Sequence, residues 1–245
     1  MHRVHRFERL PSTQDEIHRL GALGAPAGTV VVAAEQEAGR GSRGRRWASP
    51  RGGLWLSLLA RPASAVGVEL LSLRAGLAAA EALAELGGVP PVWLKWPNDL
   101  IVDDRKLGGV LCEARWQGPS PAWVALGLGI NVQNPVPHDA RVPAARLAEW
   151  RPDLTPEEVL RPLLAHLAPL AEHDGALSAA EQRALARRDW LRGRALAAPV
   201  SGIADGVSPD GGLRIRRPDG TLALVRSGEP TPAVELASIP LMADG

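Results

Sequence analysis

Residues 93–113 constrain the fold more than any other part of the chain, because their pattern predicts a β-hairpin. The apolar run that opens this stretch ends at Pro97, whose missing backbone donor stops a strand. A second strand is expected over 100–102, followed by an acidic turn and a return strand. The return strand begins at Lys106 and reaches Cys112, so Lys106 lies at the shoulder of the hairpin.

The same stretch contains both lysines of the chain, Lys95 and Lys106, among 28 lysine and arginine residues. Lysine is a compact point charge on a flexible stem, whereas arginine is a planar fork. A lysine kept in an arginine-rich chain indicates a position where arginine would not serve. Asn98 lies nearby, and Gly108-Gly109 indicates close approach of a ligand or backbone. A solvated hairpin is the alternative, and the scarcity of lysine disfavours it.

Length and composition predict a cytoplasmic globular protein. At 245 residues the chain suits one large domain, or one domain with a small appendage. A net charge of +1 does not favour nucleic acid or an anionic membrane as partner. The single cysteine, Cys112, excludes an internal disulfide and fits a reducing compartment. The N-terminal segment lacks the apolar core of a signal peptide, and no apolar run is long enough to span a bilayer.

A basic, glycine-rich loop is expected after the first buried strand. Glycines and arginines alternate in it, and Trp47 follows them: Gly39, Arg40, Gly41, Arg43, Gly44, Arg45 and Arg46. Glycines let backbone amides converge on an anion, and arginine forks suit phosphate. The loop therefore predicts binding of a phosphate-bearing ligand or a nucleic-acid backbone, with simple disorder as a third reading. It matches neither a Walker loop nor a Rossmann fingerprint.

Periodicity and capping signals predict the remaining elements. Helices are expected over 12–23, 66–86, 155–173 and 178–191, and strands over 29–34, 54–60 and 122–132. The last strand is expected to run into a turn at Gly127, Gly129 and Asn131, where ligand approach and an ordinary tight turn remain open. His166 and His173 lack a matching ligand set, so no metal role is assigned.

From Gly193 onward the sequence pattern changes to short β-strand signals, which lie over 213–217, 221–225 and 234–236. A hairpin turn is expected at 218–220. These predict a small all-β, barrel-like appendage, with a domain boundary near 190–194.

Four motifs occur in a fixed order along nearly the whole chain. They are Ser12-Thr13, the glycine–arginine segment from Gly39 to Pro50, KWPND at 95–99 with KLGG at 106–109, and Gly129-Ile130-Asn131. Together they resemble the biotin protein ligases, also called biotin–acetyl-CoA-carboxylase ligases. The resemblance implies an α+β fold with a mixed, mainly antiparallel sheet and flanking helices, similar to class II aminoacyl-tRNA synthetases. It also implies a catalytic domain over 1–191 and an SH3-like barrel over 192–245.

The implied reaction has two steps. Biotin's carboxylate attacks the α-phosphate of ATP, giving biotinyl-5′-AMP and pyrophosphate, and a lysine of a biotin carboxyl carrier protein of acetyl-CoA carboxylase then takes the biotinyl group. ATP and Mg²⁺ are expected, and nucleic acid and membrane are not expected as partners. Regulatory members carry an N-terminal helix-turn-helix domain that this sequence does not show, so we expect no repressor role. A homodimer and a monomer both remain open.

The resemblance also implies residue roles. Catalysis is expected from Lys106, Asp99 and Arg40. The biotin pocket is expected to contain Ser12, Thr13, Gln14, Gln36, Gly39, Arg40, Lys106 and Gly109. The ATP and adenylate side is expected to contain Arg40, Arg43, Arg45, Trp47, Lys95, Asn98 and Asn131.

Three positions depart from the family pattern. Ser42 replaces an arginine thought to help retain the adenylate, so we expect looser retention unless Arg43 or Arg45 substitutes. Gln14 replaces the usual asparagine. No obvious arginine follows Gly228-Glu229, which puts the appendage's contact with ATP in doubt.

Three rival functions fit the sequence less well. A lipoate or octanoate ligase would share the fold and the lysine, but the glycine–arginine loop and the KWPND hairpin favour biotin. A nucleic-acid-binding module is disfavoured by the net charge and the lack of a second basic patch. A catalytically silent biotin-binding regulator is disfavoured by the intact Lys106.

Overall fold

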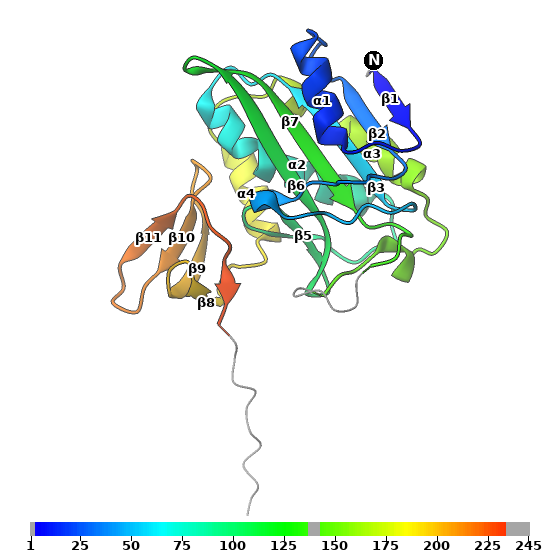
Figure 1. The fold of residues 1–245 in the computed structure, drawn as a ribbon. Helices are drawn as coiled ribbons and strands as arrows, with labels where there is room; N and C mark the ends of the chain where they lie inside the picture. The colour runs from blue at the N-terminus through cyan, green and yellow to red at the C-terminus, as the bar shows by residue number, and fades with distance from the viewer. Residues whose placement is uncertain (1–2, 137–142, 234–245) are drawn as a thin grey trace, which may run out of the picture.

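The computed structural model describes residues 3–136 and 143–233, which form two β-sheets with helices packed on the larger one (Figure 1). The larger sheet contains, in spatial order, β1 (Val4–Phe7), β2 (Val30–Ala33), β3 (Leu54–Ala60), β7 (Ser120–Ile130), β6 (Arg105–Gln117), β5 (Asp99–Val102) and β4 (Trp93–Lys95). β1 and β2 are parallel, and the other neighbouring strands are antiparallel. The predicted mixed, mainly antiparallel α+β fold is confirmed.

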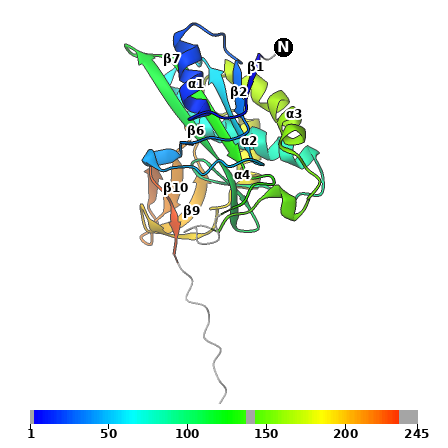
Figure 2. The same ribbon diagram turned by 45° about the vertical axis from the view of Figure 1, so that its right-hand side comes forward.

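Helices cover both faces of this sheet. They are α1 (Thr13–Ala22), α2 (Ala65–Glu85), α3 (Pro156–Leu167) and α4 (Ala179–Arg188), with short 3-10 turns η1 (Ser42–Gly44), η2 (Leu147–Glu149) and η3 (Ala168–Ala171). Figures 1 and 2 show α1 on one face and α2 on the other. Because both faces are covered, every residue of β3 is buried, as its almost entirely apolar sequence predicts. Among the described residues, no helix is long and apolar enough to cross a membrane.

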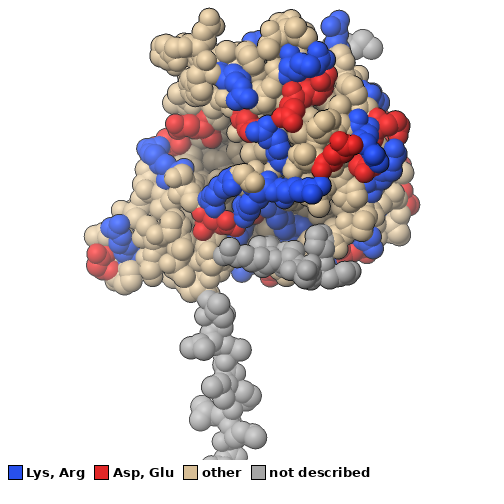
Figure 3. Space-filling view, viewed as in Figure 1, with Lys and Arg blue, Asp and Glu red and all other residues tan. Residues whose placement is uncertain are grey.

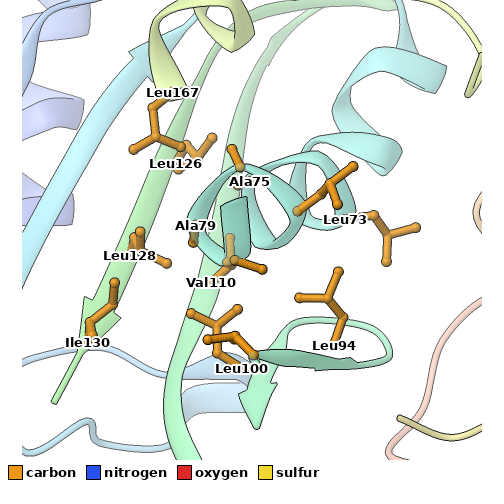
Figure 4. Packing of buried hydrophobic residues seen from close by; sticks show 14 of the residues in the cluster. Leu73, Ala75, Ala79, Leu94, Leu100, Val110, Leu126, Leu128, Ile130 and Leu167 are labelled. Atoms are coloured by element: carbon orange, nitrogen blue, oxygen red, sulfur yellow. The ribbon is translucent and has the colours of Figure 1, made fainter. Parts of the chain in front are cut away.

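The main core lies between α2 and the sheet. Figure 4 shows Ala75 and Ala79 of α2 on the side of Leu126 and Leu128 of β7, and Leu73 on the side of Leu94. Alanine on the helix lets its backbone lie close to the sheet, and each fully buried leucine contributes about 1.5–3 kcal/mol. This packing of α2 against one face supports the sheet rigidly.

The predicted helix starts are confirmed. The Ser12 hydroxyl accepts a hydrogen bond from the Gln14 amide, and Thr155 and Ser178 form capping boxes with glutamates three residues on. The helix predicted over 155–173 is shorter: α3 ends at Leu167 and η3 follows. Pro169 explains the break, because it has no backbone N–H to continue the helix.

The C-terminal appendage is all-β, as predicted, and its strands form the smaller sheet, which is antiparallel. Its spatial order is β11 (Leu222–Val225), β10 (Leu213–Arg216), β9 (Gly202–Val207), β8 (Ala195–Ala198) and β12 (Thr231–Pro232). This sheet is consistent with the SH3-like barrel, and the hairpin turn at 218–220 is confirmed. All five strands come after residue 191, where the domain boundary is predicted. The division of the chain into two domains at this point stays a prediction. The strand predicted over 234–236 lies outside the described residues.

Candidate active site

A cavity of about 250 Å³ opens where the N-terminus of α1, the loop after β2 and strands β5, β6 and β7 meet. Figure 3 shows basic side chains in a band across the middle of this face, beside a hollow in the surface. Most of the predicted site residues line the cavity: Ser12, Thr13, Gln14, Gln36, Arg40, Arg45, Trp47, Asn98, Asp99, Lys106 and Gly109. These residues come from separate parts of the chain, between Ser12 and Gly109, and the fold brings them together in one place.

Lys106 is a partly buried cation on the cavity wall. The predicted hairpin turn is formed by Asp103 and Asp104, whose φ values of 48° and 56° suit a tight hairpin. The Lys106 Nζ lies 2.6 Å from Asp99 Oδ1 and 5.1 Å from the centre of the Trp47 ring. The lysine is thus held by a carboxylate and by an aromatic face, which attracts cations.

The two glycines of the hairpin have different uses. A Cβ atom on Gly108 would lie 2.4 Å from the carbonyl oxygen of Gly129, so glycine is required for β6 to approach β7. A Cβ on Gly109 would meet its nearest atoms, on Asn98, Asp99 and Lys106, at no less than 3.5 Å. Gly109 therefore keeps space open at the cavity wall, whereas Gly108 confirms the expected close backbone approach.

Arg40 connects the loop after β2 to two carboxylates. Its Nη1 donates to Asp15 Oδ1 and its Nη2 donates to Glu113 Oε1, both at 2.6 Å. Charge-assisted contacts of this length are the strong ones among protein hydrogen bonds. The Arg40 guanidinium is therefore aimed by α1 and β6 together.

The rest of the loop is held by the smaller sheet. Arg43 and Arg45 both donate to the carboxylate of Glu229, and Arg45 also donates to the hydroxyl and carbonyl oxygens of Ser42. Arg45 and Ser42 line the cavity, whereas Arg43 does not. Burial opposes ionisation of Glu229, but the hydrogen bond and charge of Arg45 and the charge of Arg43 outweigh it, so the pKa of Glu229 is lowered.

A chain of hydrogen bonds crosses the cavity wall from α1 to the loop. Gln36 Oε1 accepts from the Thr13 amide at 2.8 Å and from the Thr13 hydroxyl at 3.1 Å. Gln36 Nε2 donates to Ser49 Oγ at 2.8 Å, and the Ser49 hydroxyl donates to the Trp47 carbonyl oxygen. These contacts fix the side chains of Thr13 and Gln36, which line the cavity.

The turn predicted at Gly127, Gly129 and Asn131 is wrong, because both glycines lie inside β7. A Cβ on Gly129 would lie 2.8 Å from the Trp47 indole nitrogen, so the indole packs directly on the sheet at this glycine. A Cβ on Gly127 would lie 3.0 Å from the side-chain amide of Gln14. Each glycine therefore leaves a flat surface on which a cavity side chain packs, Trp47 at Gly129 and Gln14 at Gly127. A strand tolerates these glycines because β7 pairs with β3 on one side and with β6 on the other.

Four predicted residues do not line the cavity. Gly39 lies behind it, where a Cβ would lie 2.4 Å from Ser49 Oγ, and Arg43 turns toward the smaller sheet. Lys95 is buried and lies 5.6 Å from the centre of the Trp190 ring. Asn131 is buried and donates to the Ala145 carbonyl oxygen at 3.0 Å, pinning the segment beside Lys106. Their nucleotide-side and biotin-side roles stay predictions.

Three polar residues around the cavity were not predicted. Glu229 lines it from the smaller sheet, and Ser57 and Glu113 lie behind Gln14. Ser57 carried a signal that could have been used, because it is the single polar residue in the apolar run of β3. Glu113 and Glu229 carry no local signal that separates them from other surface glutamates.

No metal site is evident: the part of the chain that the structure describes contains no cluster of three or more His, Cys, Asp and Glu side chains suited to a metal. Around the cavity, Asp15, Asp99, Glu113 and Glu229 are each ion-paired with arginine or lysine. A cation here would have to find most of its ligands on a bound molecule.

Comparison with known proteins identifies relatives of this chain. The model of the biotin/lipoate A/B protein ligase family matches residues 6–131. The biotin–[acetyl-CoA-carboxylase] ligase of Paracoccus denitrificans is 33% identical over 229 residues, covering 86% of this chain and 93% of that protein. The bifunctional ligase/repressor BirA of Bacillus subtilis is 39% identical over 132 residues, covering 53% of this chain and 40% of that protein. This chain thus spans about two fifths of BirA's length.

The fold matches solved structures as well. The biotin protein ligase from Aquifex aeolicus, in complex with biotin and ATP, superposes with a TM-score of 0.77 at 29% identity. The match covers 94% of this chain and 98% of that chain, so it includes both sheets.

Proposed function

Because the chain belongs to the biotin/lipoate A/B protein ligase family, we propose that it is an ATP-dependent biotin protein ligase. It forms biotinyl-5′-AMP and pyrophosphate from biotin and ATP, and transfers the biotinyl group to a lysine of a biotin carboxyl carrier protein. The observation that carries this proposal is the cavity in which Lys106, paired with Asp99, faces the arginine loop. The two-sheet match to a biotin and ATP complex supports it.

In the first step a carboxylate oxygen of biotin attacks the α-phosphorus of ATP, and pyrophosphate leaves with the electrons of the broken P–O bond. Negative charge on the phosphoryl oxygens has to be stabilised, and fixed cations in a sheltered cavity do this best. Lys106 contacts the carboxylate and the α-phosphate, Arg40 and Arg45 hold phosphate oxygens, and the indole of Trp47 shields the adenylate.

In the second step the amine of the carrier lysine attacks the acyl carbon, and AMP leaves. The amine must lose a proton, which Asp99 accepts, or Asp99 orients the groups around it. Lys106, whose Nζ pairs with Asp99 Oδ1 at 2.6 Å, then stabilises the negative charge that develops on the oxygen of the acyl carbon.

Mg²⁺ is expected to enter with ATP. The described residues offer no ligand cluster, and Mg²⁺ commonly keeps its own waters and binds mainly to substrate phosphates. Lys95 and Asn98 support the nucleotide side, while Ser12, Thr13, Gln14 and Gln36 contact the biotin ring system. We propose a biotin carboxyl carrier protein as the partner of this chain, and we propose no repressor function.

Biotin-dependent ATP–pyrophosphate exchange tests this function, with lipoate and octanoate in parallel because the family model covers lipoate ligases too. We expect exchange with biotin alone. Lys106→Ala should abolish it to below about one hundredth of the wild-type rate, since it removes the central cation. Arg105→Ala is the matched control, because this neighbouring cation pairs with Glu149 and does not line the cavity. Exchange with lipoate or octanoate and not with biotin would contradict the proposal, and no exchange with any acid would favour the silent regulator.

A further inference from the structure

We propose that Glu113 is a positioning residue that fixes Gln14 and Arg40 at the cavity wall and makes the site select a ligand with an N–H group. This role rests on the proposed function, because biotin carries two such groups in its ring system. Glu113 itself does not line the cavity, so it would act through the two side chains that do.

Glu113 uses its two oxygens for two different partners. Its Oε2 accepts from Gln14 Nε2 at 3.0 Å, and its Oε1 accepts from Arg40 Nη2 at 2.6 Å. A glutamine at this position would have one acceptor oxygen and one donor nitrogen, so it could satisfy only one of the two partners. The arrangement therefore requires a carboxylate, and the side chain is mostly buried, at 23% exposure.

The surroundings of Gln14 fix which end of its amide faces which way. Besides Glu113, its Nε2 faces the carbonyl oxygens of Leu111 at 3.2 Å and Ala125 at 3.3 Å. All three neighbours accept hydrogen bonds, so the nitrogen must occupy this side. Glu113 supplies the charge-assisted contact of the three, which is the strongest kind.

The oxygen of Gln14 is consequently the atom left for a ligand. Oε1 accepts from the Ser57 hydroxyl at 2.9 Å, and a carbonyl oxygen has a second lone pair. Gln14 lines the cavity while being 3% exposed, and its amide packs on Gly127, so it has little room to turn. The wall therefore offers an acceptor, which favours the ring N–H groups of biotin over the chain of octanoate or the dithiolane ring of lipoate, neither of which has an N–H to donate.

Asp15 supplies the matched control. It accepts from Arg40 Nη1 at 2.6 Å, as Glu113 does from Nη2, but it has no contact with Gln14 among the described hydrogen bonds. Asp15→Asn therefore loosens Arg40 alone, whereas Glu113→Gln disturbs both Arg40 and Gln14.

The experiment is a double-mutant cycle on biotin binding by calorimetry, without ATP, on full-length wild type, Glu113→Gln, Gln14→Ala and the double variant. We expect Glu113→Gln to weaken binding about tenfold, as for loss of a hydrogen bond to a charged group. In the Gln14→Ala background the same change should weaken binding about twofold or less. Asp15→Asn should weaken binding equally in both backgrounds.

The proposal is overturned if Glu113→Gln binds biotin as the wild type does, or if its effect is undiminished in Gln14→Ala. Melting curves check folding, and Glu113→Asp, which withdraws both oxygens by one methylene, replaces Glu113→Gln in the cycle if that variant does not fold. Absence of biotin binding by the wild type would instead overturn the proposed function.

Discussion

At the scale of single residues, the side chain of Arg45 lies beside Ser42, the position at which the family pattern has an arginine. Its side chain lines the cavity and donates to both the hydroxyl and the carbonyl oxygen of Ser42. Arg43, by contrast, donates to Glu229 and does not line the cavity. Of the two candidates to retain the adenylate in place of the missing arginine, the geometry favours Arg45.

We predict that Arg45→Ala releases biotinyl-5′-AMP about tenfold faster, because a charge-assisted phosphate contact is lost. A chase of labelled adenylate measures the release rate, and Arg43→Ala should change it less. Ser42→Arg should slow release below the wild-type rate. Equal release from wild type and Ser42→Arg would contradict the idea that Ser42 loosens retention.

At the scale of elements, α2 and α4 are joined by a buried ion pair. Arg74, whose side chain is 2% exposed, donates to Glu181 Oε1 at 2.7 Å and to the carbonyl oxygens of Gly175 and Ala176. Burial raises the pKa of Glu181, but hydrogen bonds from Arg74 and Ser178 outweigh it and lower this pKa to about 2.

We predict that Glu181→Gln lowers the free energy of unfolding by about 3 kcal/mol, because it leaves a buried guanidinium uncompensated. The contribution of Glu181 is fully present above its ordinary pKa of 4.5 and is lost as the pH falls toward about 2. Urea unfolding between pH 6 and pH 3 should thus show a shallower loss of stability in the variant. Glu157→Gln, which breaks an exposed pair with Arg6, is the control and should cost under about 1 kcal/mol. A slope equal to that of the wild type would refute the assignment.

At the scale of the whole molecule, the smaller sheet takes part in the cavity through Glu229. This residue, near β12, accepts from Arg43 and Arg45 of the loop that belongs to the larger sheet. A second tie runs from the Trp96 indole to the carbonyl oxygen of Gly211 at 2.8 Å. The smaller sheet thus reaches the arginine loop with a carboxylate and not with an arginine.

We predict that Glu229→Gln speeds amide hydrogen exchange of residues 39–47 up to about fivefold, the size expected for a partly exposed ion pair. Mass spectrometry of the ligand-free protein measures this directly. Asp210→Asn breaks the pair with Arg226 inside the smaller sheet and should leave the loop unchanged. Unchanged exchange in Glu229→Gln would mean that the loop is ordered without the smaller sheet.

Local pattern was enough to predict most of the elements, including the hairpin that lines the cavity. The apolar run of β3, the caps at Thr155 and Ser178, and the hairpin carrying Lys106 each depend on neighbours in the chain. The family motifs also predicted many of the residues that line the cavity, because residues such as Asp99 belong to those short motifs.

Long-range contacts, in contrast, emerged from the folded chain. Gln14 and Glu113 are 99 positions apart in the chain, and Arg45 and Glu229 are 184 positions apart. The residues next to each of them in the sequence do not indicate the partner. Gly129 was misread as a turn for the same reason, because the Trp47 ring that requires it comes from a distant loop. Periodicity and capping depend on backbone geometry within a few residues, so the sequence shows them. The partner of a buried charge, or the surface on which an aromatic ring packs, depends on which strands become neighbours in the fold.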